Sequence, residues 1–247
     1  MISLMLMLSM AVAKAGDCLT FQTSDGQTQS VEIGSGLTLA LDGSTLTVGN
    51  VSFTLADLDK MFFTECVSVG TTGWATYSST KNLDYAAGGL TAYSAQFDDN
   101  AGTVSLTALT EAVPGGEGVV ISGASGDYYV PVATAATELT DNGLLGTCST
   151  AVTADGLNYY VLAKTDDLHV GFCRLESDQM IPANKAYYVA SSGNQTRYLI
   201  TQETTAIEKV ATATDEGDDT IYDLQGRRVD NPRKGIYIRN GKKVVIK

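Results

Sequence analysis

Residues 90–109, LTAYSAQFDDNAGTVSLTAL, contain two stretches in which apolar and polar residues alternate, LTAYSAQF (90–97) and TVSLTAL (103–109). A period of two is typical of a β-strand with one buried face. The five residues between them, DDNAG, are of the types that form turns. The stretch therefore predicts two strands joined by a tight turn.

The same arrangement recurs at spacings near ten residues between positions 66 and 192. Many short strands with regular turns favour an antiparallel sandwich or barrel, which we expect over residues 66–200. Abundant Thr, Val, Tyr, Ser and Gly agree with an all-β fold. The further strands expected here are GWATYS (73–78), GVVISG (118–123), DYYVPV (127–132), LNYYVLA (157–163), HVGFCRL (169–175) and KAYYVAS (185–191).

Residues 16–65 predict a small N-terminal β meander that leans on its neighbour. Asp-Gly pairs at 25–26 and 42–43 stand between alternating apolar runs, which is a strong hairpin signal. LADLDKMFF (55–63) predicts one short helical turn before the next strand.

The first fifteen residues, MISLMLMLSMAVAKA, are apolar and end in the small-x-small pattern Ala13-Lys14-Ala15. This pattern predicts a secretory signal peptide (1–15) that is cleaved after Ala15; a buried N-terminal strand or helix is the alternative. The run is too short to span a bilayer, and no later segment reaches that length, so we expect no transmembrane segment.

The charge is distributed unevenly along the chain. The net charge is −12, yet residues 221–247 carry eight Lys and Arg against two Asp, a local charge of +6 that leaves −18 for the remainder. An acidic surface repels phosphate backbones, which argues against nucleic acid as a partner. Residues 201–220 predict an acidic linker; a calcium site at Asp215, Asp218 and Asp219 is the alternative, although the EF-hand spacing is missing.

The chain has four cysteines, Cys18, Cys66, Cys148 and Cys173. An even number in an exported chain allows two disulfides, and proximity in the sequence favours Cys18–Cys66 and Cys148–Cys173. Four buried thiols are the alternative. Because there is no Cys-x-x-Cys spacing and only one histidine, His169, we expect neither a metal site nor a cofactor.

The residues give no pattern for catalysis. His169 lies in a strand-like segment, no Gly-x-Ser-x-Gly motif occurs, and most carboxylates fall in turns such as Asp98-Asp99-Asn100. We therefore expect that the protein is not an enzyme. The better candidates for function are aromatic side chains of the middle region, which suit stacking against a sugar if they are exposed and are core residues otherwise. They are Trp74, Tyr77, Tyr128, Tyr159 and Tyr187.

The basic tail IYDLQGRRVDNPRKGIYIRNGKKVVIK (221–247) predicts a compact three-stranded β unit. It resembles the C-terminal sorting domain of the type IX (Por) secretion system. The matching positions are Tyr222, Asp223, Gly226, Arg227, Lys234, Gly235, Tyr237, Lys242 and Lys243. The resemblance implies passage through the periplasm, recognition by the type IX secretion machinery, and secretion or display on the outer cell surface with removal of the tail. The middle region resembles an uncharacterised β module of secreted Bacteroidetes-type proteins, which implies a fold and a habitat but no activity.

Together these features predict an exported, non-enzymatic surface or secreted protein that acts by adhesion or ligand binding. The ligand would be a glycan or a surface protein. One alternative is a carbohydrate-binding module of a glycan-degrading system, which would need a platform of coplanar exposed rings. A hydrolase is a less favoured alternative. A structural component would instead show an exposed edge strand that is open to β-addition.

Overall fold

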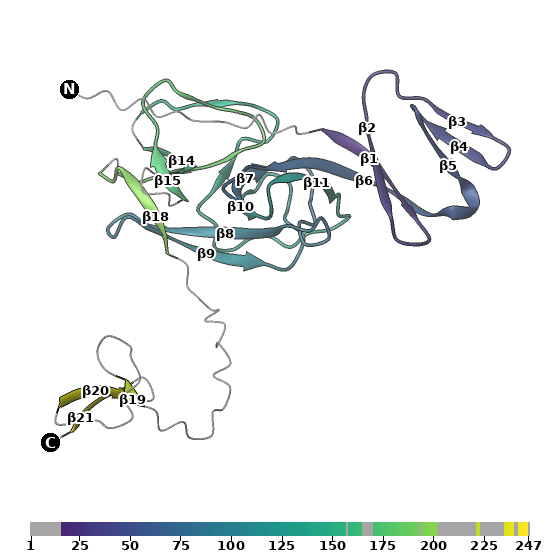
Figure 1. Cartoon of the computed structure of the whole chain (residues 1–247). Helices are drawn as coiled ribbons and strands as arrows, with labels where there is room; N and C mark the ends of the chain where they lie inside the picture. The colour runs from purple at the N-terminus through teal and green to yellow at the C-terminus, as the bar shows by residue number, and fades with distance from the viewer. Residues whose placement is uncertain are drawn as a thin grey trace. The chain divides into compact units, whose positions relative to one another are not determined.

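A computed structural model shows an almost entirely β chain, which confirms the predicted fold class (Figure 1). It describes residues 16–156, 158–164, 170–192 and 194–201, and the backbone of strands at 221–222, 235–239 and 242–246. In this part of the chain no helix is long and apolar enough to cross a membrane. The chain divides into two compact units, residues 1–203 and 204–247.

The N-terminal lobe of the first unit consists of two small antiparallel sheets. One contains β1, β2 and the first half of β6; the other is the meander β3-β4-β5. Both predicted Asp-Gly turns are present, at the β1–β2 and β3–β4 connections, where Gly26 and Gly43 have positive φ. The elements are β1 (Asp17–Thr23), β2 (Thr28–Glu32), β3 (Leu39–Asp42), β4 (Thr45–Val48), β5 (Val51–Thr54), the short 3-10 turn η1 (Leu55–Asp57) and β6 (Leu58–Val69).

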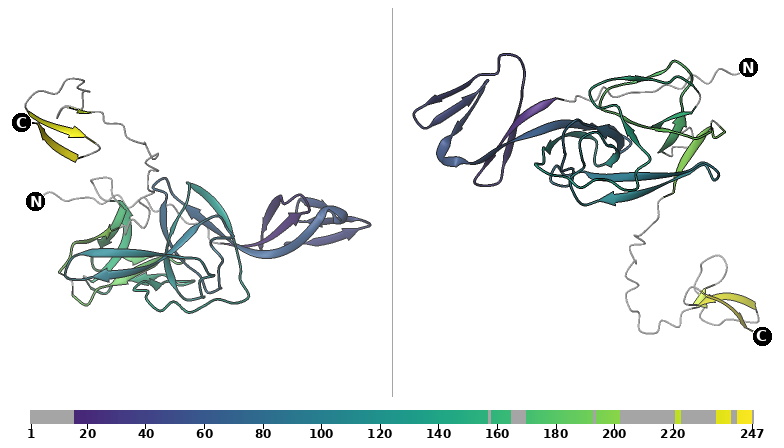
Figure 2. Two further views of the ribbon diagram at one scale, coloured as in Figure 1. Left: turned by 90° about the horizontal axis from the view of Figure 1, so that it is seen from below. Right: turned by 180° about the vertical axis from the view of Figure 1, so that it is seen from behind.

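The twelve-residue strand β6 connects the lobe to the rest of the unit. Residues 58–65 of β6 pair with β1, and residues 64–69 pair with β11 (Gly126–Pro131) on the other side. The predicted domain boundary between residues 65 and 66 therefore falls inside one continuous strand. Figures 1 and 2 show the lobe projecting from the main body of the unit along this strand.

The main body is a nine-stranded, nearly closed barrel-like sheet in the order β12-β17-β14-β15-β18-β9-β8-β10-β7. Its pairs are antiparallel except β18–β9, which is parallel. The sequence predicted seven of these nine strands. Strands β12 and β18 were not predicted, nor was the small β13–β16 sheet. The bounds are β7 (Trp74–Ser78), β8 (Thr91–Asp98), β9 (Thr103–Leu109), β10 (Gly118–Ser122), β12 (Leu145–Gly146), β13 (Val152–Thr153), β14 (Tyr159–Lys164), β15 (Val170–Arg174), β16 (Met180–Ile181), β17 (Ala186–Val189) and β18 (Arg197–Thr201).

A hydrogen-bonded seam joins the two edges of this sheet. The buried Ser78 at the end of β7 donates from Oγ to the Lys185 carbonyl (2.8 Å) and accepts from the Cys148 amide (2.9 Å). The Asn184 side-chain amide donates to the Ser78 carbonyl (3.1 Å). The chains approach closely here, because a Cβ on Gly146 would lie 2.7 Å from the Gly116 carbonyl oxygen. Side-chain bonds thus replace the ladder that a fully closed barrel would have.

Two hydrophobic cores lie on the two faces of the same strands. On β10, Val119 and Ile121 pack into a core with Val67 and Val69 of β6, whereas Val120 points to the opposite core inside the barrel. Alternate residues of a strand face opposite sides, so β10 is buried on both. Burial on both faces explains why consecutive residues of β10 (GVVIS), Val119, Val120 and Ile121, are all apolar.

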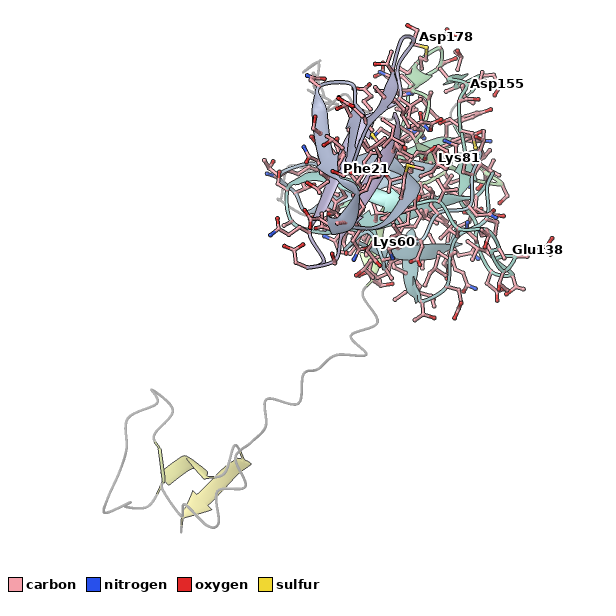
Figure 3. The ribbon with its side chains drawn as sticks, turned by 90° about the vertical axis from the view of Figure 1, so that its right-hand side faces the viewer. Phe21, Lys60, Lys81, Glu138, Asp155 and Asp178 are labelled. Atoms are coloured by element: carbon pink, nitrogen blue, oxygen red, sulfur yellow. The ribbon has the colours of Figure 1, made fainter. Side chains whose placement is uncertain are left out.

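The carboxylate of Glu65 lies between the lobe and the barrel, with only 6 % of the residue exposed. It accepts hydrogen bonds from Tyr77 Oη (3.2 Å) and Ser79 Oγ (2.9 Å), and it pairs with Lys81 Nζ (3.3 Å). Lys81, labelled in Figure 3, also pairs with Asp17 of β1. Burial and the charge of Glu65 raise the pKa of the Tyr77 hydroxyl, so Tyr77 stays a proton donor.

The second unit contains a three-stranded antiparallel sheet in the order β19-β20-β21. Its strands are β19 (Ile221–Tyr222), β20 (Gly235–Arg239) and β21 (Lys242–Ile246). The predicted three-stranded β unit is therefore confirmed. Most of the predicted linker, residues 202–220, lies outside the described residues.

The Ser78 seam predicts a stability defect in the Ser78→Ala variant. The change leaves the Cys148 amide without its acceptor in a buried place, which costs about 1–3 kcal/mol. Urea unfolding should show this loss in the free energy of unfolding. The control is Ser105→Ala on β9, whose hydroxyl makes only a 3.4 Å contact with Thr201 and should change little. Equal stability of the two variants would contradict a seam held by Ser78.

Candidate functional site

The N-terminal lobe carries the densest group of exposed apolar side chains in the described part of the chain. Ten large apolar residues are exposed among all the described residues, and six of these belong to the lobe, between Ile33 and Phe63. We call these six the lobe surface. They are Ile33, Leu39, Leu41, Leu55, Met61 and Phe63.

The part of the lobe surface on β6 is exposed because no other element among the described residues covers this segment of the strand. Met61, Phe63, Glu65 and Val67 share one face of the strand. The barrel covers Glu65 and Val67, and Leu58 packs against the core of the meander. Met61 and Phe63, between these two contacts, remain 54 % and 60 % exposed. Their cross-strand partners Phe21 and Leu19 are buried, and Phe21 stacks on Phe53 of β5 at 4.4 Å.

The second part of the lobe surface lies on β3, at the edge of the meander. Leu39 and Leu41 are 54 % and 65 % exposed, although they stand opposite Val48 and Leu46 on the apolar face of the sheet. Exposed acidic residues surround the lobe, and its only basic residue is Lys60, which lies over the Phe62 ring at 5.3 Å (Figure 3). The acidic residues are Asp17, Asp25, Glu32, Asp42, Asp57 and Asp59. Such a surface suits an apolar partner, with basic groups at its margin.

A second distinct site is the carboxylate of Asp99, in the turn between β8 and β9. Its Oδ1 accepts from the hydroxyls of Tyr188 and Tyr198, each at 2.7 Å, and its Oδ2 accepts from the hydroxyl and amide of Ser191. The three partner residues come from β17, β18 and the loop between them. Sequence reasoning took this carboxylate for a solvated turn residue. That description fits Asp98, which caps the turn amides of Asn100 and Ala101.

The protonation of Asp99 follows from these bonds. Partial burial alone would raise its pKa, but the hydroxyls of Ser191, Tyr198 and Tyr188 together outweigh burial and lower the pKa to about 2. Burial and the bond to Asp99 raise the pKa of both tyrosines. The group is therefore a fixed acceptor at neutral pH, which suits a structural anchor better than a general acid.

The five aromatic residues predicted for ligand stacking do not share one surface. Tyr77 is fully buried at Glu65, and Trp74 packs against Tyr93 (5.5 Å) beside the barrel core. Tyr128 packs against the other core and donates to the Ala124 carbonyl (2.9 Å). Only Tyr159 and Tyr187 come together.

Tyr159 and Tyr187 lie on one outer face of the barrel with nearly parallel rings, 5.7 Å apart and inclined by 17°. Tyr159 is half-buried and Tyr187 is 9 % exposed. A hydrogen bond to Asp155 raises the pKa of Tyr159. A partly exposed ring beside a carboxylate is the arrangement here that most resembles a sugar subsite.

The cysteines occupy two regions of the first unit. Cys18 on β1 and Cys66 on β6 are buried and line one small pocket with Gly16, Glu32 and Tyr129. The strand register places Cys18 opposite Thr64, so Cys66 is its diagonal neighbour. Diagonal neighbours are about 7–8 Å apart, which is beyond the usual Cα–Cα range of about 4.4–6.8 Å in a disulfide.

The other two cysteines are further apart in the sheet. Cys148 follows β12 and Cys173 lies in β15, with β17 and β14 between these strands. Both predicted disulfides stay predictions.

Other predicted site residues are placed only in part. Tyr222, Gly235, Tyr237, Lys242 and Lys243 lie on the strands of the second unit. Asp223, Gly226, Arg227, Lys234 and His169 lie outside the described residues, as do the residues of the alternative calcium site. Within the described residues, no group of three or more His, Cys, Asp and Glu side chains could hold a metal ion.

Asp99 predicts a pH-dependent contribution to stability. Because its pKa is lowered in the folded state relative to about 3.9 in the unfolded state, its stabilisation is present above pH 4 and is lost as the pH falls toward 2. Asp99→Asn should lower the free energy of unfolding by about 1–3 kcal/mol at pH 7 and flatten its dependence on pH between 4 and 2. Urea titrations at several pH values measure both. The exposed Asp141→Asn serves as control, and an unchanged pH dependence in Asp99→Asn would refute the assignment.

Comparison of the chain with protein families, with curated protein sequences and with solved structures finds no significant match.

Proposed function

We propose that this is an exported, non-enzymatic protein of the cell surface or the medium that acts by adhesion or ligand binding through its lobe surface. The observation that carries the proposal is the concentration of exposed apolar side chains on that lobe: six of ten among the described residues. Exposed apolar groups cost free energy in water, and large patches mark interaction sites. The barrel acts as the scaffold that holds the lobe.

The hydrogen bonding of the enclosed carboxylates favours binding over glycoside hydrolysis. A typical glycoside hydrolase would need two carboxylates that converge on one cleft. Glu65 and Asp99 instead belong to separate networks, each occupied by hydroxyl donors from the protein itself. These groups hold strands together.

Delivery is the part of the proposal that rests on the tail. The sorting-domain resemblance, the N-terminal signal pattern and the local charge of +6 support export by a type IX-like route. The three-stranded sheet of residues 221–246 is consistent with a tail that is recognised as a folded unit.

Carbohydrate binding is the second candidate. The parallel rings of Tyr159 and Tyr187 beside Asp155 favour it. The low exposure of Tyr187 leaves less ring surface than a sugar platform needs, so the lobe surface is the better candidate.

The binding proposal predicts that charges on β6 weaken adhesion. The double variant Met61→Lys/Phe63→Lys should bind at least about tenfold more weakly to a polystyrene surface, because burial of each side chain contributes about 1.5–3 kcal/mol. Adsorption isotherms of the purified full chain measure this, and attachment of cells that display the chain provides a second readout. Met180→Lys/Leu199→Lys on the barrel is the matched control. Equal loss in both double variants would show that the lobe is not the contact surface.

Delivery has its own test in a host with a type IX system. Residues 204–247 are attached to a periplasmic reporter, and the cells are fractionated. Reporter at the surface or in the medium, with its tail removed, is the expected result. Intact reporter in the periplasm would refute this route while leaving the adhesion assay unaffected.

A further inference from the structure

The edge strand β3 has features that monomeric proteins usually avoid. It is the outer strand of the meander, and none of the described residues pairs with its second edge. Natural edge strands commonly carry lysine, proline or a bulge that blocks addition of another strand. Residues 37–41, LTLAL, contain none of these, and the strand's only charge is Asp42 at its end.

The backbone groups at this edge can be assigned from the ladder with β4. The Gly49 amide donates to the Thr38 carbonyl (2.9 Å), and the register continues as Leu39 opposite Val48 and Ala40 opposite Thr47. Hydrogen-bonded and non-hydrogen-bonded pairs alternate in an antiparallel ladder. Thr38, Ala40 and Asp42 therefore direct their backbone groups toward β4, while Leu39 and Leu41 direct theirs toward the open edge.

We propose that β3 pairs with β3 of a second copy of this chain, antiparallel and centred on Ala40. In this register Leu39 stands opposite Leu41 of the second copy, and the outward backbone groups of both residues are satisfied. The two meanders become one six-stranded sheet with a continuous apolar face. A two-fold axis makes the contact self-complementary, so the assembly closes as a dimer.

Charge selects this arrangement and this partner. The centred antiparallel register places each Asp42 opposite Thr38 of the other copy, whereas a parallel pairing would bring the two Asp42 carboxylates side by side. The rest of the lobe is bordered by acidic residues, which repel a second copy. The stretch Thr38–Leu41 is uncharged, so two copies can approach there without like-charge contact.

The dimer extends beyond the proposed function, because it leaves Met61 and Phe63 of β6 available to another partner. It would present two such surfaces on one particle. Two linked binding surfaces bind more tightly than a single one, even though no new kind of contact is formed. The adhesion assay and the dimer test therefore have independent outcomes.

The first test is sedimentation of the full chain over a range of concentrations. The native chain should show a monomer–dimer equilibrium, and Leu39→Lys/Leu41→Lys should weaken it by at least about tenfold, since each variant dimer would have four lysines at the junction. Met180→Lys, equally exposed but on the barrel, should dimerise like the native chain. A native chain that is monomeric at all concentrations, or a dimer unaffected by the two lysines, would overturn the proposal.

A second variant tests the register and does not depend on the lysine variant folding. Ala40 lies on the axis as a non-hydrogen-bonded pair, with Cα atoms about 4.5 Å apart, which is within the range for a disulfide. The Ala40→Cys variant is oxidised with diamide, which takes up the two electrons and two protons of two thiols. The expected product is a covalent dimer, and peptide mapping should place its disulfide at residue 40. In the Thr38→Cys variant the two cysteines of the dimer would be four strand positions apart, so this variant should not form the covalent dimer. Equal cross-linking of the two variants would rule out the centred register.

Discussion

The buried carboxylate of Glu65 is the contact on which the rest of the first unit depends. It lies where β6 leaves the lobe and enters the barrel. Removing a charged group from water costs several kcal/mol, and only good partners offset this. Tyr77, Ser79 and Lys81 are those partners, and all three come from the end of β7 or the residues after it. The carboxylate therefore fixes β7 against β6, and Lys81 extends the network to Asp17 of β1.

The two parts of the unit on either side of Glu65 differ in how well β6 is covered. On the barrel side of Glu65, the same face of β6 packs into the core with Val119 and Ile121. On the lobe side, Met61 and Phe63 remain exposed because the core that the meander forms with β1 and β6 includes Leu19, Phe21 and Leu58 but not these two residues. The barrel thus contains the packed cores, and the lobe carries the exposed apolar surface. The exposed apolar side chains of the lobe are the physical basis for proposing adhesion. The unpaired edge of β3 adds a means of self-association.

Local patterns in the sequence predicted most strands well. The Asp25-Gly26 and Asp42-Gly43 hairpins, and the two strands of residues 90–109, follow from residue type and a period of two. The features that were missed depend on distant partners. Asp99 looks like its neighbour Asp98 in sequence, but its donors Tyr188, Ser191 and Tyr198 lie about ninety or more residues away. Likewise, the parallel β18–β9 pair and the continuity of β6 through residue 65 have no local signal. The exposure of Met61 and Phe63 could not be predicted either, because an apolar residue in a strand is expected to be covered.

The coupling of lobe and barrel through Glu65 is tested most directly by unfolding the full chain with two probes. Fluorescence of the single tryptophan, Trp74, reports on the barrel, and amide hydrogen exchange of β1–β5 reports on the lobe. Coincident transitions in urea are expected for the native chain, because Glu65 couples the lobe to the barrel. In Glu65→Ala, which leaves the Tyr77 hydroxyl without its acceptor and Lys81 with Asp17 as its remaining carboxylate partner, the lobe should open at lower urea than the barrel. Separate transitions in the native chain, or coincident ones in Glu65→Ala, would contradict this coupling.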